Sequence, residues 1–262
     1  MKTKILVVLL INIITATTAT ATFSIVAVDM LTGEIGSAGA TCIGAEDGAL
    51  AISDIVLGFG AIHTQSFYHP TNQNNARLRM LAGDTPQQII DWLATPANDV
   101  NNDPSQRQYN IVSLNSGEPL SAAFTGLNSF DEFIHITGAN YAIAGNILIS
   151  QDVVTDMELA FNNTNGTLAG KLMAALQAAK RVGADSRCES FGISSASAFI
   201  RVANLCDMDS SYGNLSMDLN VWIPSGGAII EPIDTLQTAF DEHSFDGTCV
   251  NENIFANGFE LP

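Results

Sequence analysis

Hydrophobic and polar residues follow two different periods along the chain, and these periods predict strands and helices in separate blocks. Short runs rich in β-branched and aromatic residues, bounded by turn residues, predict strands. These runs lie at 22–29, 35–43, 48–67, 108–114, 119–126, 140–150, 194–203 and 215–224. Apolar residues spaced three and four apart predict helices. The helical segments lie at 72–83, 85–95, 150–163, 166–183 and 233–244.

The order of these elements predicts an α+β fold with antiparallel sheets. The turn sequences "LTGE" (31–34) and "NSGE" (115–118) join neighbouring strands as hairpins. Hairpins outnumber β-α-β units, which favours sheets with segregated helices over a doubly wound parallel sheet. One helix, at 85–95, carries a complete start signal, with Thr85 as N-cap, Pro86 at the first helical position and Gln88 closing a capping box.

The N-terminus has the pattern of a cleaved export signal. Lys2 and Lys4 precede an apolar stretch at 5–14, and small residues then lead to the A-x-A triplet that ends at Ala21. The apolar stretch is too short for a typical transmembrane helix, which needs roughly 20 residues. A cut after Ala21 makes Thr22 the first residue of the mature chain. A cut after Ala19 and an uncleaved anchor are the alternatives.

This leader defines the expected organisation of the chain. We expect a signal peptide at 1–21, one domain at 22–245 and a polar, turn-rich tail at 246–262. The mature chain is expected to be secreted or periplasmic and to contain no membrane span. The sequence does not determine the oligomeric state, and a homo-oligomer is one of the alternatives.

An acidic composition excludes one class of partner. The chain has 262 residues, 47% of them hydrophobic, and a formal net charge of −17. The hydrophobic fraction is sufficient for a sizeable core. Nucleic acid is not expected as a partner, because phosphate binding needs clustered Lys and Arg.

The four cysteines, Cys42, Cys188, Cys206 and Cys249, are interpreted through the expected compartment. In an oxidising compartment they allow up to two disulfides, with three alternative pairings. They are too widely spaced in the sequence to form a zinc motif.

A threonine at the start of a mature chain combines a nucleophile and a base in one residue. Its free α-amine has an ordinary pKa of about 7.7–8.0, so near neutral pH part of it is uncharged. The uncharged amine can take the proton of the Thr22 hydroxyl, whose oxygen then attacks a carbonyl carbon. The sequence lacks G-x-S-x-G, H-E-x-x-H and a Gly-rich phosphate loop. The alternative is that Thr22 is a first strand residue with no chemistry.

No cofactor or metal is predicted, although one stretch resembles a calcium loop. Asp207–Asp218 has alternating oxygen ligands, but its glycine falls one position late and its twelfth residue is Asp rather than Glu. A plain turn between strands is therefore the favoured interpretation.

Separated blocks of the chain resemble the DUF1028 family. The sequence "TFSIVAVDMLTGEIGSAGA" at 22–40 resembles the start of the family pattern. Four further blocks follow in the family's order: "GFGAIHTQSFYHP" (58–70), "AFTG" (123–126), "YAIAGNIL" (141–148) and "GADSR" (183–187). The family is assigned to the N-terminal-nucleophile (Ntn) hydrolase-like superfamily. The resemblance therefore implies a four-layer αββα sandwich and, by analogy of fold alone, hydrolysis of an amide bond.

The chain departs from the family pattern at three positions. Cys42 stands where the family often has Lys, Ala144 where many members have Gln, and Cys188 where Gly usually follows the arginine. The missing Lys weakens any mechanism in which a lysine tunes the terminal amine. The paired gain of Cys42 and Cys188 suggests a disulfide between them. The alternative is a reactive Cys42 thiol near the site.

Two residues are candidates for catalysis. Thr22 is the expected nucleophile. Asn146 follows a glycine in an apolar strand, and its amide could help form an oxyanion hole. The structural alternative for Asn146 is an amide that braces a turn.

The other candidates are expected to bind substrate. His63, Thr64 and Gln65 lie at the end of an apolar strand, where side chains from both faces emerge. Asp185 and Arg187 could hold a polar substrate or a carboxylate. The alternatives are ordinary strand-end hydrogen bonds and a structural ion pair.

The sequence thus predicts an exported hydrolase that cleaves an amide bond in a small-molecule or peptide substrate. The alternative is a catalytically silent exported protein on the same fold that binds a small molecule or a cell-wall fragment.

Overall fold

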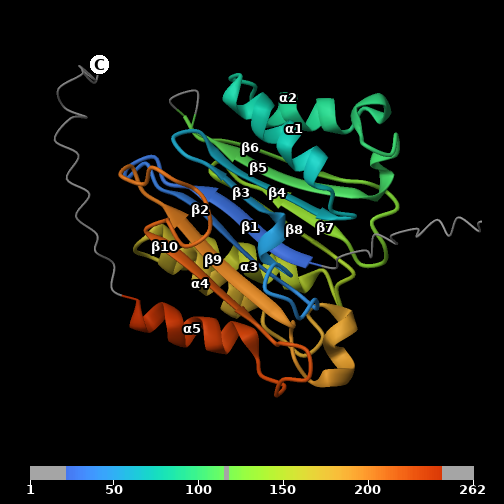
Figure 1. The fold of residues 1–262 in the computed structure, drawn as a ribbon, viewed down its shortest axis with the longest axis vertical. Helices are drawn as coiled ribbons and strands as arrows, with labels where there is room; N and C mark the ends of the chain where they lie inside the picture. Colours follow the sequence, from blue (N-terminus) through green and yellow to red (C-terminus); the bar gives the residue numbers. More distant parts are fainter. Residues whose placement is uncertain (1–21, 115–117, 244–262) are drawn as a thin grey trace, which may run out of the picture.

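Two antiparallel β-sheets stack face to face between two layers of helices in the computed structural model, which describes residues 22–114 and 118–243 (Figure 1). The larger sheet has six strands in the order β10-β9-β2-β1-β8-β7. Its strands are β1 (Thr22–Val28), β2 (Ile35–Thr41), β7 (Ile134–Thr137), β8 (Tyr141–Asn146), β9 (Ser197–Ala203) and β10 (Met217–Trp222). The predicted signal peptide at 1–21 and tail at 246–262 lie outside the described residues.

The smaller sheet has four strands in the order β3-β4-β5-β6. They are β3 (Ser53–Val56), β4 (Gly60–Ser66), β5 (Arg107–Ser113) and β6 (Leu120–Thr125). Each neighbouring pair is antiparallel, so the sheet is a meander built from sequential hairpins and one longer connection.

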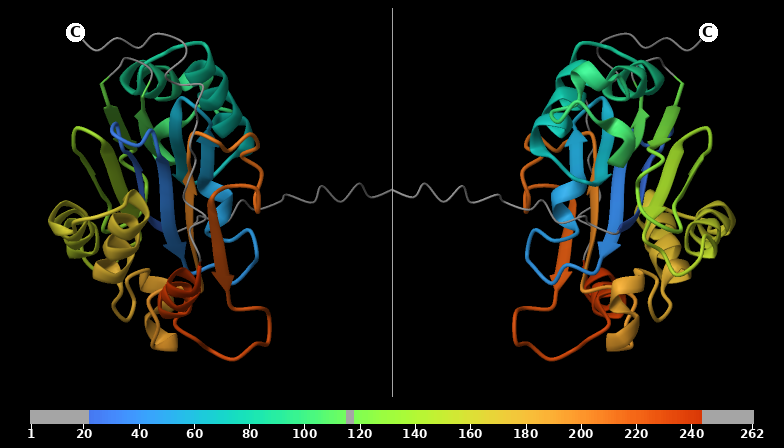
Figure 2. Two further views of the ribbon diagram at one scale, coloured as in Figure 1. Left: turned by 90° about the vertical axis from the view of Figure 1, so that its left-hand side faces the viewer. Right: turned by 90° about the vertical axis from the view of Figure 1, so that its right-hand side faces the viewer.

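Helices cover the outer face of each sheet, and the two side views show them on opposite sides of the molecule (Figure 2). The four-stranded sheet is covered by α1 (Pro70–Leu81) and α2 (Pro86–Leu93). The six-stranded sheet is covered by α3 (Asp152–Asn163), α4 (Leu168–Ala179) and α5 (Pro232–Glu242). The predicted αββα sandwich is therefore confirmed.

The strand alternation of β1 shows how the sequence sorts side chains between layers. Phe23 and Ile25 point toward α3 and α4 and belong to the core under those helices. Val26 and Val28 point the other way and join a second core between the sheets, with Val112 from β5. Because successive side chains point to opposite faces, Thr22 and Ser24 share the inter-sheet face with Val26.

The layer between the sheets is apolar at one end and polar at the other. The apolar end is filled by the core that contains Val26 and Val28. At the polar end the side chains are fully buried yet carry hydroxyl, amide and imidazole groups. They include Thr22, Ser24, Ser37, Thr41, His63, Gln65, Gln108, Asn110 and Asn146. Buried polar groups need hydrogen-bond partners, so this end of the sandwich is held together by a polar network.

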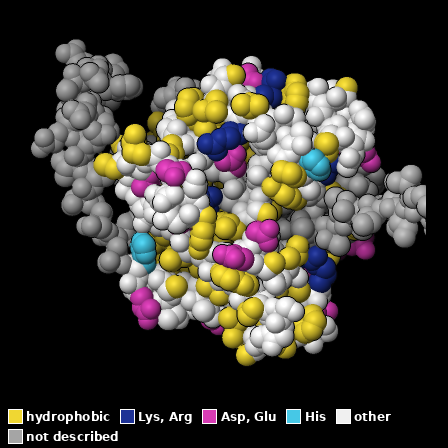
Figure 3. Space-filling view, in the orientation of Figure 1, with side chains coloured by type: hydrophobic (Ala, Val, Ile, Leu, Met, Phe, Trp, Pro, Cys, Tyr) yellow, Lys and Arg dark blue, Asp and Glu magenta, His cyan; other side chains and the backbone are white. Residues whose placement is uncertain are grey.

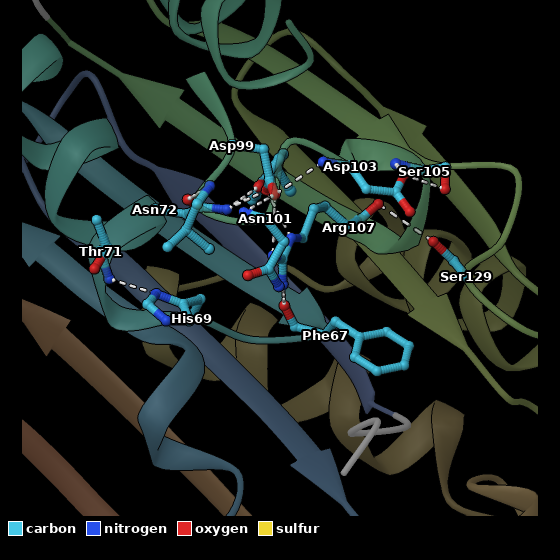
Figure 4. A network of polar contacts seen from close by, with 12 residues as sticks. Phe67, His69, Thr71, Asn72, Asp99, Asn101, Asp103, Ser105, Arg107 and Ser129 are labelled. Carbon is cyan, nitrogen blue, oxygen red and sulfur yellow. Dashed lines mark hydrogen bonds and ion pairs between the residues drawn. The ribbon is translucent and has the colours of Figure 1, made fainter. Parts of the chain in front are cut away.

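The connection from α2 to β5 is fixed by a buried ion pair (Figure 4). The Asp99 carboxylate accepts from Arg107 Nε at 2.7 Å and from Asn72 Nδ2 at 2.6 Å. Arg107 Nη1 also donates to the carbonyl oxygen of Phe67, at the end of β4. Asp99 thus joins the loop to both β5 and α1.

The structure confirms the predicted helices and strands and adds a short edge strand and several 3₁₀ helices. The Thr85 and Gln88 capping box is present at α2. The predicted run 48–67 contains a 3₁₀ turn (Leu50–Ile52) followed by β3 and β4. The short edge strand β7 and a 3₁₀ helix, η4 (Ser186–Phe191), were not predicted.

Charged groups are dispersed on the molecular face seen in Figure 1. Lys and Arg side chains form separate small groups there, among hydrophobic and acidic side chains (Figure 3). Within the described ranges, no helix combines the length and the apolarity that crossing a membrane requires.

Candidate functional site

Thr22 is the first residue of β1, which lies in the middle of the six-stranded sheet between β2 and β8. Its direct partners are Thr41 on β2 and Asn146 on β8. Side chains of directly paired residues lie on the same face of a sheet, with Cβ atoms about 4.5–5.5 Å apart. The three side chains therefore gather on the inter-sheet face, where all three are fully buried.

Two glutamines from the opposite sheet reach across to this group. Gln65 Nε2 donates to Gln108 Oε1 at 2.6 Å and approaches the carbonyl oxygen of Thr22 at 3.5 Å. Gln108 Nε2 donates to the Gly145 carbonyl oxygen and to Thr125 Oγ1, both at 2.9 Å. The glutamines thus bridge β4 and β5 to the strand ends that carry Thr22 and Asn146.

The Asn146 amide is held at one end only. Its Nδ2 donates to Gln108 Oε1 at 3.0 Å. Its Oδ1 is buried and has no hydrogen-bond partner. This is unusual, because most buried side-chain polar atoms in proteins are hydrogen-bonded.

Asp185 and Arg187 form an ion pair at the edge of the same group. The Asp185 carboxylate accepts from Arg187 Nη2 at 2.9 Å and from the Cys42 backbone amide at 2.6 Å. Arg187 Nη2 also lies 3.3 Å from Thr41 Oγ1. The ion pair, which was the structural alternative for these two residues, is therefore present, and it places the guanidinium beside the residue that pairs with Thr22. The substrate-binding roles of Asp185 and Arg187 stay predictions.

A disulfide fixes this ion pair to the sheet. Cys42, directly after β2, is bonded to Cys188 in η4, with the two Cα atoms 5.6 Å apart. The suggested pairing is thus confirmed. The alternative of a reactive Cys42 thiol is wrong, because the sulfur is already bonded. Cys249 lies outside the described residues.

His63 lies between the sheets at some remove from Thr22. Its Nδ1 is 2.9 Å from Ser24 Oγ and its Nε2 is 2.6 Å from Ser37 Oγ. Burial, helped by the positive charge of Arg201, lowers the pKa of His63 to about 3. The imidazole is therefore neutral over the physiological pH range and is bound on both sides by hydroxyls.

Among the three predicted residues of β4, only Gln65 contacts Thr22. Thr64 is buried on the same face of β4 as Ile62, which packs in the core under α1 and α2. The structure therefore separates the run 63–65 into two layers. The substrate-binding roles of His63, Thr64 and Gln65 stay predictions.

Sequence reasoning missed two residues that complete the group, Thr41 and Gln108. The signal for Gln108 was present in its strand, where Gln108 and Asn110 alternate with Tyr109 and Ile111. Amides at alternate positions indicate that one face of a strand meets a polar layer. Which layer it meets depends on the partner sheet, and that information is not local.

The Asp207–Asp218 stretch is a turn whose end carboxylates bind protein groups. Asp207 accepts from the Ser216 hydroxyl at 2.9 Å and from the Asn204 amide at 2.8 Å. Asp218 pairs with Arg201 at 2.8 Å. Across the part of the chain that the structure describes, no three His, Cys, Asp or Glu side chains are grouped as metal ligands.

The fold and the site define a class of protein: a four-layer αββα sandwich with a buried polar site at the start of its central strand. Residues 22–221 match the family model described as "Family of unknown function (DUF1028)", and the chain belongs to this family.

A solved structure supports the same placement. The crystal structure of protein SPO2555 from Silicibacter pomeroyi, which has the same family model, is 25% identical to this chain. The match covers 85% of this chain and 88% of that one, with a TM-score of 0.64. No curated protein matches the chain.

Proposed function

We propose that the protein is an exported N-terminal-nucleophile hydrolase that cleaves an amide bond, with Thr22 as the nucleophile. The observation that carries this proposal is a coincidence at one residue. The family match starts at residue 22. The predicted A-x-A cut exposes the same residue.

The proposed base is the α-amine that the cut releases. The amine takes the proton of the Thr22 hydroxyl while Oγ forms a bond to the substrate carbonyl carbon. The ammonium then returns the proton to the leaving amine as the amide bond breaks. Water hydrolyses the resulting ester and restores the threonine.

The histidines of the chain do not supply this base. His63 is neutral, but both of its nitrogens are bound to serine hydroxyls. His69 caps α1, His135 contacts Thr125, and His243 contacts the Ser216 carbonyl. An amine base at Thr22 needs none of them.

Asn146 and Arg187 have roles in this proposal that follow from their positions. An amide nitrogen carries two hydrogens, and Asn146 Nδ2 makes one hydrogen bond. Its second hydrogen, together with backbone amides, would stabilise the oxyanion. Arg187, beside Thr41, would hold a polar group of the substrate.

An apolar pocket lies next to this end of the site and guides the choice of substrates. It has a volume of about 360 Å³ and is lined by the Cys42–Cys188 disulfide and by Phe191, Ile193 and Ile223, among others. Amides with an apolar group near the scissile bond are therefore sensible probes.

Export is part of the proposal, since it supplies the peptidase that makes the N-terminus. The leader pattern supports it, and so does the Cys42–Cys188 disulfide, because disulfides persist in oxidising compartments. The substrate is then an extracytoplasmic amide or peptide.

The first test is the N-terminus of the mature protein. N-terminal sequencing and intact mass of the exported chain are expected to show Thr22 as the first residue. A mature chain that begins elsewhere would rule out the mechanism.

The second test is activity on a panel of p-nitroanilides and small peptides. Thr22→Ala is expected to reduce hydrolysis to the uncatalysed background, because it removes the nucleophile. Thr22→Ser is the matched control, since it keeps both the hydroxyl and the amine, and it should retain activity. Activity that survives in Thr22→Ala would contradict the proposal. A chain that starts at Thr22 yet cleaves no amide would favour a binding protein on the same fold.

A further inference from the structure

The side-chain oxygen of Asn146, Oδ1, is a buried hydrogen-bond acceptor that receives no hydrogen bond. Asn146 is fully buried, and its Oδ1 makes no hydrogen bond. The inference drawn from this atom rests on the proposed function, because it concerns the α-amine of Thr22.

The orientation of the Asn146 amide is fixed by its neighbour. Gln108 Nε2 faces three acceptors: the Gly145 carbonyl at 2.9 Å, Thr125 Oγ1 at 2.9 Å and the Ile134 carbonyl at 3.3 Å. Gln108 Oε1 must therefore face the other way, toward donors. Those donors are Gln65 Nε2 at 2.6 Å and Asn146 Nδ2 at 3.0 Å. With Nδ2 directed to Gln108, Asn146 turns its oxygen away from Gln108.

Thr22 is the direct strand partner of Asn146, and the two side chains share one face. In the uncut chain, residue 22 has a single backbone N–H hydrogen. The cut converts this amide into an ammonium with three hydrogens, which adds donors beside Asn146. The acceptor that lacks a donor, Asn146 Oδ1, thus belongs to the strand partner of the residue that gains the ammonium.

We propose that Asn146 is a positioning residue for the Thr22 α-amine, whose N–H it accepts through Oδ1. An acceptor on the amine orients the nitrogen, and therefore its lone pair, toward the hydroxyl of the same residue. It also stabilises the charged amine, so it sets the pH above which the base is available. The Asn146 side chain would thus accept a hydrogen bond from the amine through Oδ1 and donate one to the oxyanion through Nδ2.

The test measures the pKa of the Thr22 amine without any substrate. The exported, mature protein is labelled with trace acetic anhydride between pH 5 and 10, and mass spectrometry quantifies acetylation of its N-terminal peptide. Asn146→Asp places a carboxylate next to the ammonium and is expected to raise the labelling midpoint by about one pH unit or more. Asn146→Ala removes the acceptor and is expected to lower the midpoint. Gln108 keeps Gln65 as a donor in both variants.

A matched control makes the same charge change at the far end of β8. Asn140 donates to the Val28 carbonyl at 2.7 Å and lies about 20 Å from Asn146 by strand rise. Asn140→Asp is expected to leave the labelling midpoint unchanged.

The outcomes separate this inference from the proposed function. Shifts in opposite directions support it, and a merely structural role for Asn146 would not produce them. If Asn146→Asp does not fold, an unchanged midpoint in Asn146→Ala is sufficient to overturn the assignment. Unchanged midpoints with Thr22→Ala inactive reject only the Asn146 role. Shifted midpoints with Thr22→Ala active reject only Thr22 as the nucleophile. A first residue other than Thr22, or an amine that stays unlabelled at every pH, rejects both.

Discussion

The buried polar residues between the sheets form one directed chain of hydrogen bonds. Ser24 donates its only hydroxyl hydrogen to Gln65 Oε1 at 2.5 Å, so it must accept from His63 Nδ1. His63 Nε2 then accepts from Ser37, which in turn accepts from Ser53. The network therefore fixes the neutral His63 tautomer with its proton on Nδ1. It also fixes the orientation of the Gln65 amide beside Thr22, whose oxygen accepts from Ser24.

The depressed pKa of His63 predicts a pH dependence of stability. Its folded pKa of about 3 lies below the ordinary value of 6.5. Protonation therefore favours the unfolded chain, and this histidine reduces stability as pH falls from about 6.5 toward 3. The free energy of unfolding of His63→Gln, measured by urea denaturation from pH 4 to 7, should fall less steeply on acidification than that of the wild type.

The control for this experiment is His69→Asn, which replaces the N-cap histidine of α1 by asparagine, a preferred N-cap residue. Its free energy of unfolding at pH 7 is expected to stay close to that of the wild type. Equal slopes for His63→Gln and the wild type would contradict the prediction.

At the residue scale, the sequence singled out Thr22 and Asn146 as candidates but did not show that they are direct neighbours on adjacent strands. Nothing local to position 146 shows that its strand lies beside residue 22. The layers in which His63 and Thr64 lie were equally hidden, because the face on which each residue lies depends on which sheet covers β4. The Cys42–Cys188 bond came from the family resemblance and not from spacing.

At the scale of elements, the loop before β5 depends on the buried Asp99–Arg107 pair, whose side chains are 0% and 4% exposed. Asp99→Asn is expected to leave the Arg107 charge without its partner. Breaking a buried pair in this way costs about 3–5 kcal/mol of unfolding free energy. Chemical denaturation measures the loss.

Asp103→Asn is the matched control in the same loop. Asp103 accepts from the Ser105 amide at 3.0 Å in an exposed position. Since asparagine is also a good cap, a change within about 1 kcal/mol is expected. Similar losses in the two variants would show that burial of the ion pair is not the cause.

Most elements could be predicted because their periods are strong. The helix α2 carries its own capping box, and the hairpin β1–β2 alternates small and β-branched residues around a turn. The strand β7 has only the four residues Ile134–Thr137 and is half exposed, so its alternation is too short to predict. The 3₁₀ helix η4 depends on tertiary contacts, including its disulfide.

At the scale of the whole molecule, one covalent bond spans much of the chain. The Cys42–Cys188 disulfide closes a sequence separation of 146 residues. Replacing both cysteines, Cys42→Ser with Cys188→Ser, is expected to lower the free energy of unfolding by about 2–5 kcal/mol. The contact from the backbone amide at position 42 to Asp185 needs no sulfur, so the double variant can keep it.

Non-reducing digestion with mass spectrometry provides the control, since it should recover the peptide that contains Cys42 linked to the one that contains Cys188. A double variant as stable as the wild type would show that the bond adds no constraint to the unfolded chain.

The central place of β1 has a consequence for the timing of the proposed cut before Thr22. Thr22 is paired on both sides and fully buried in the described fold. A peptidase must bind the bond before Thr22 as extended, unpaired chain. The proposed cut must therefore come before β1 pairs with β2 and β8 in the sheet. Folding of the large sheet would then be a late event that follows export.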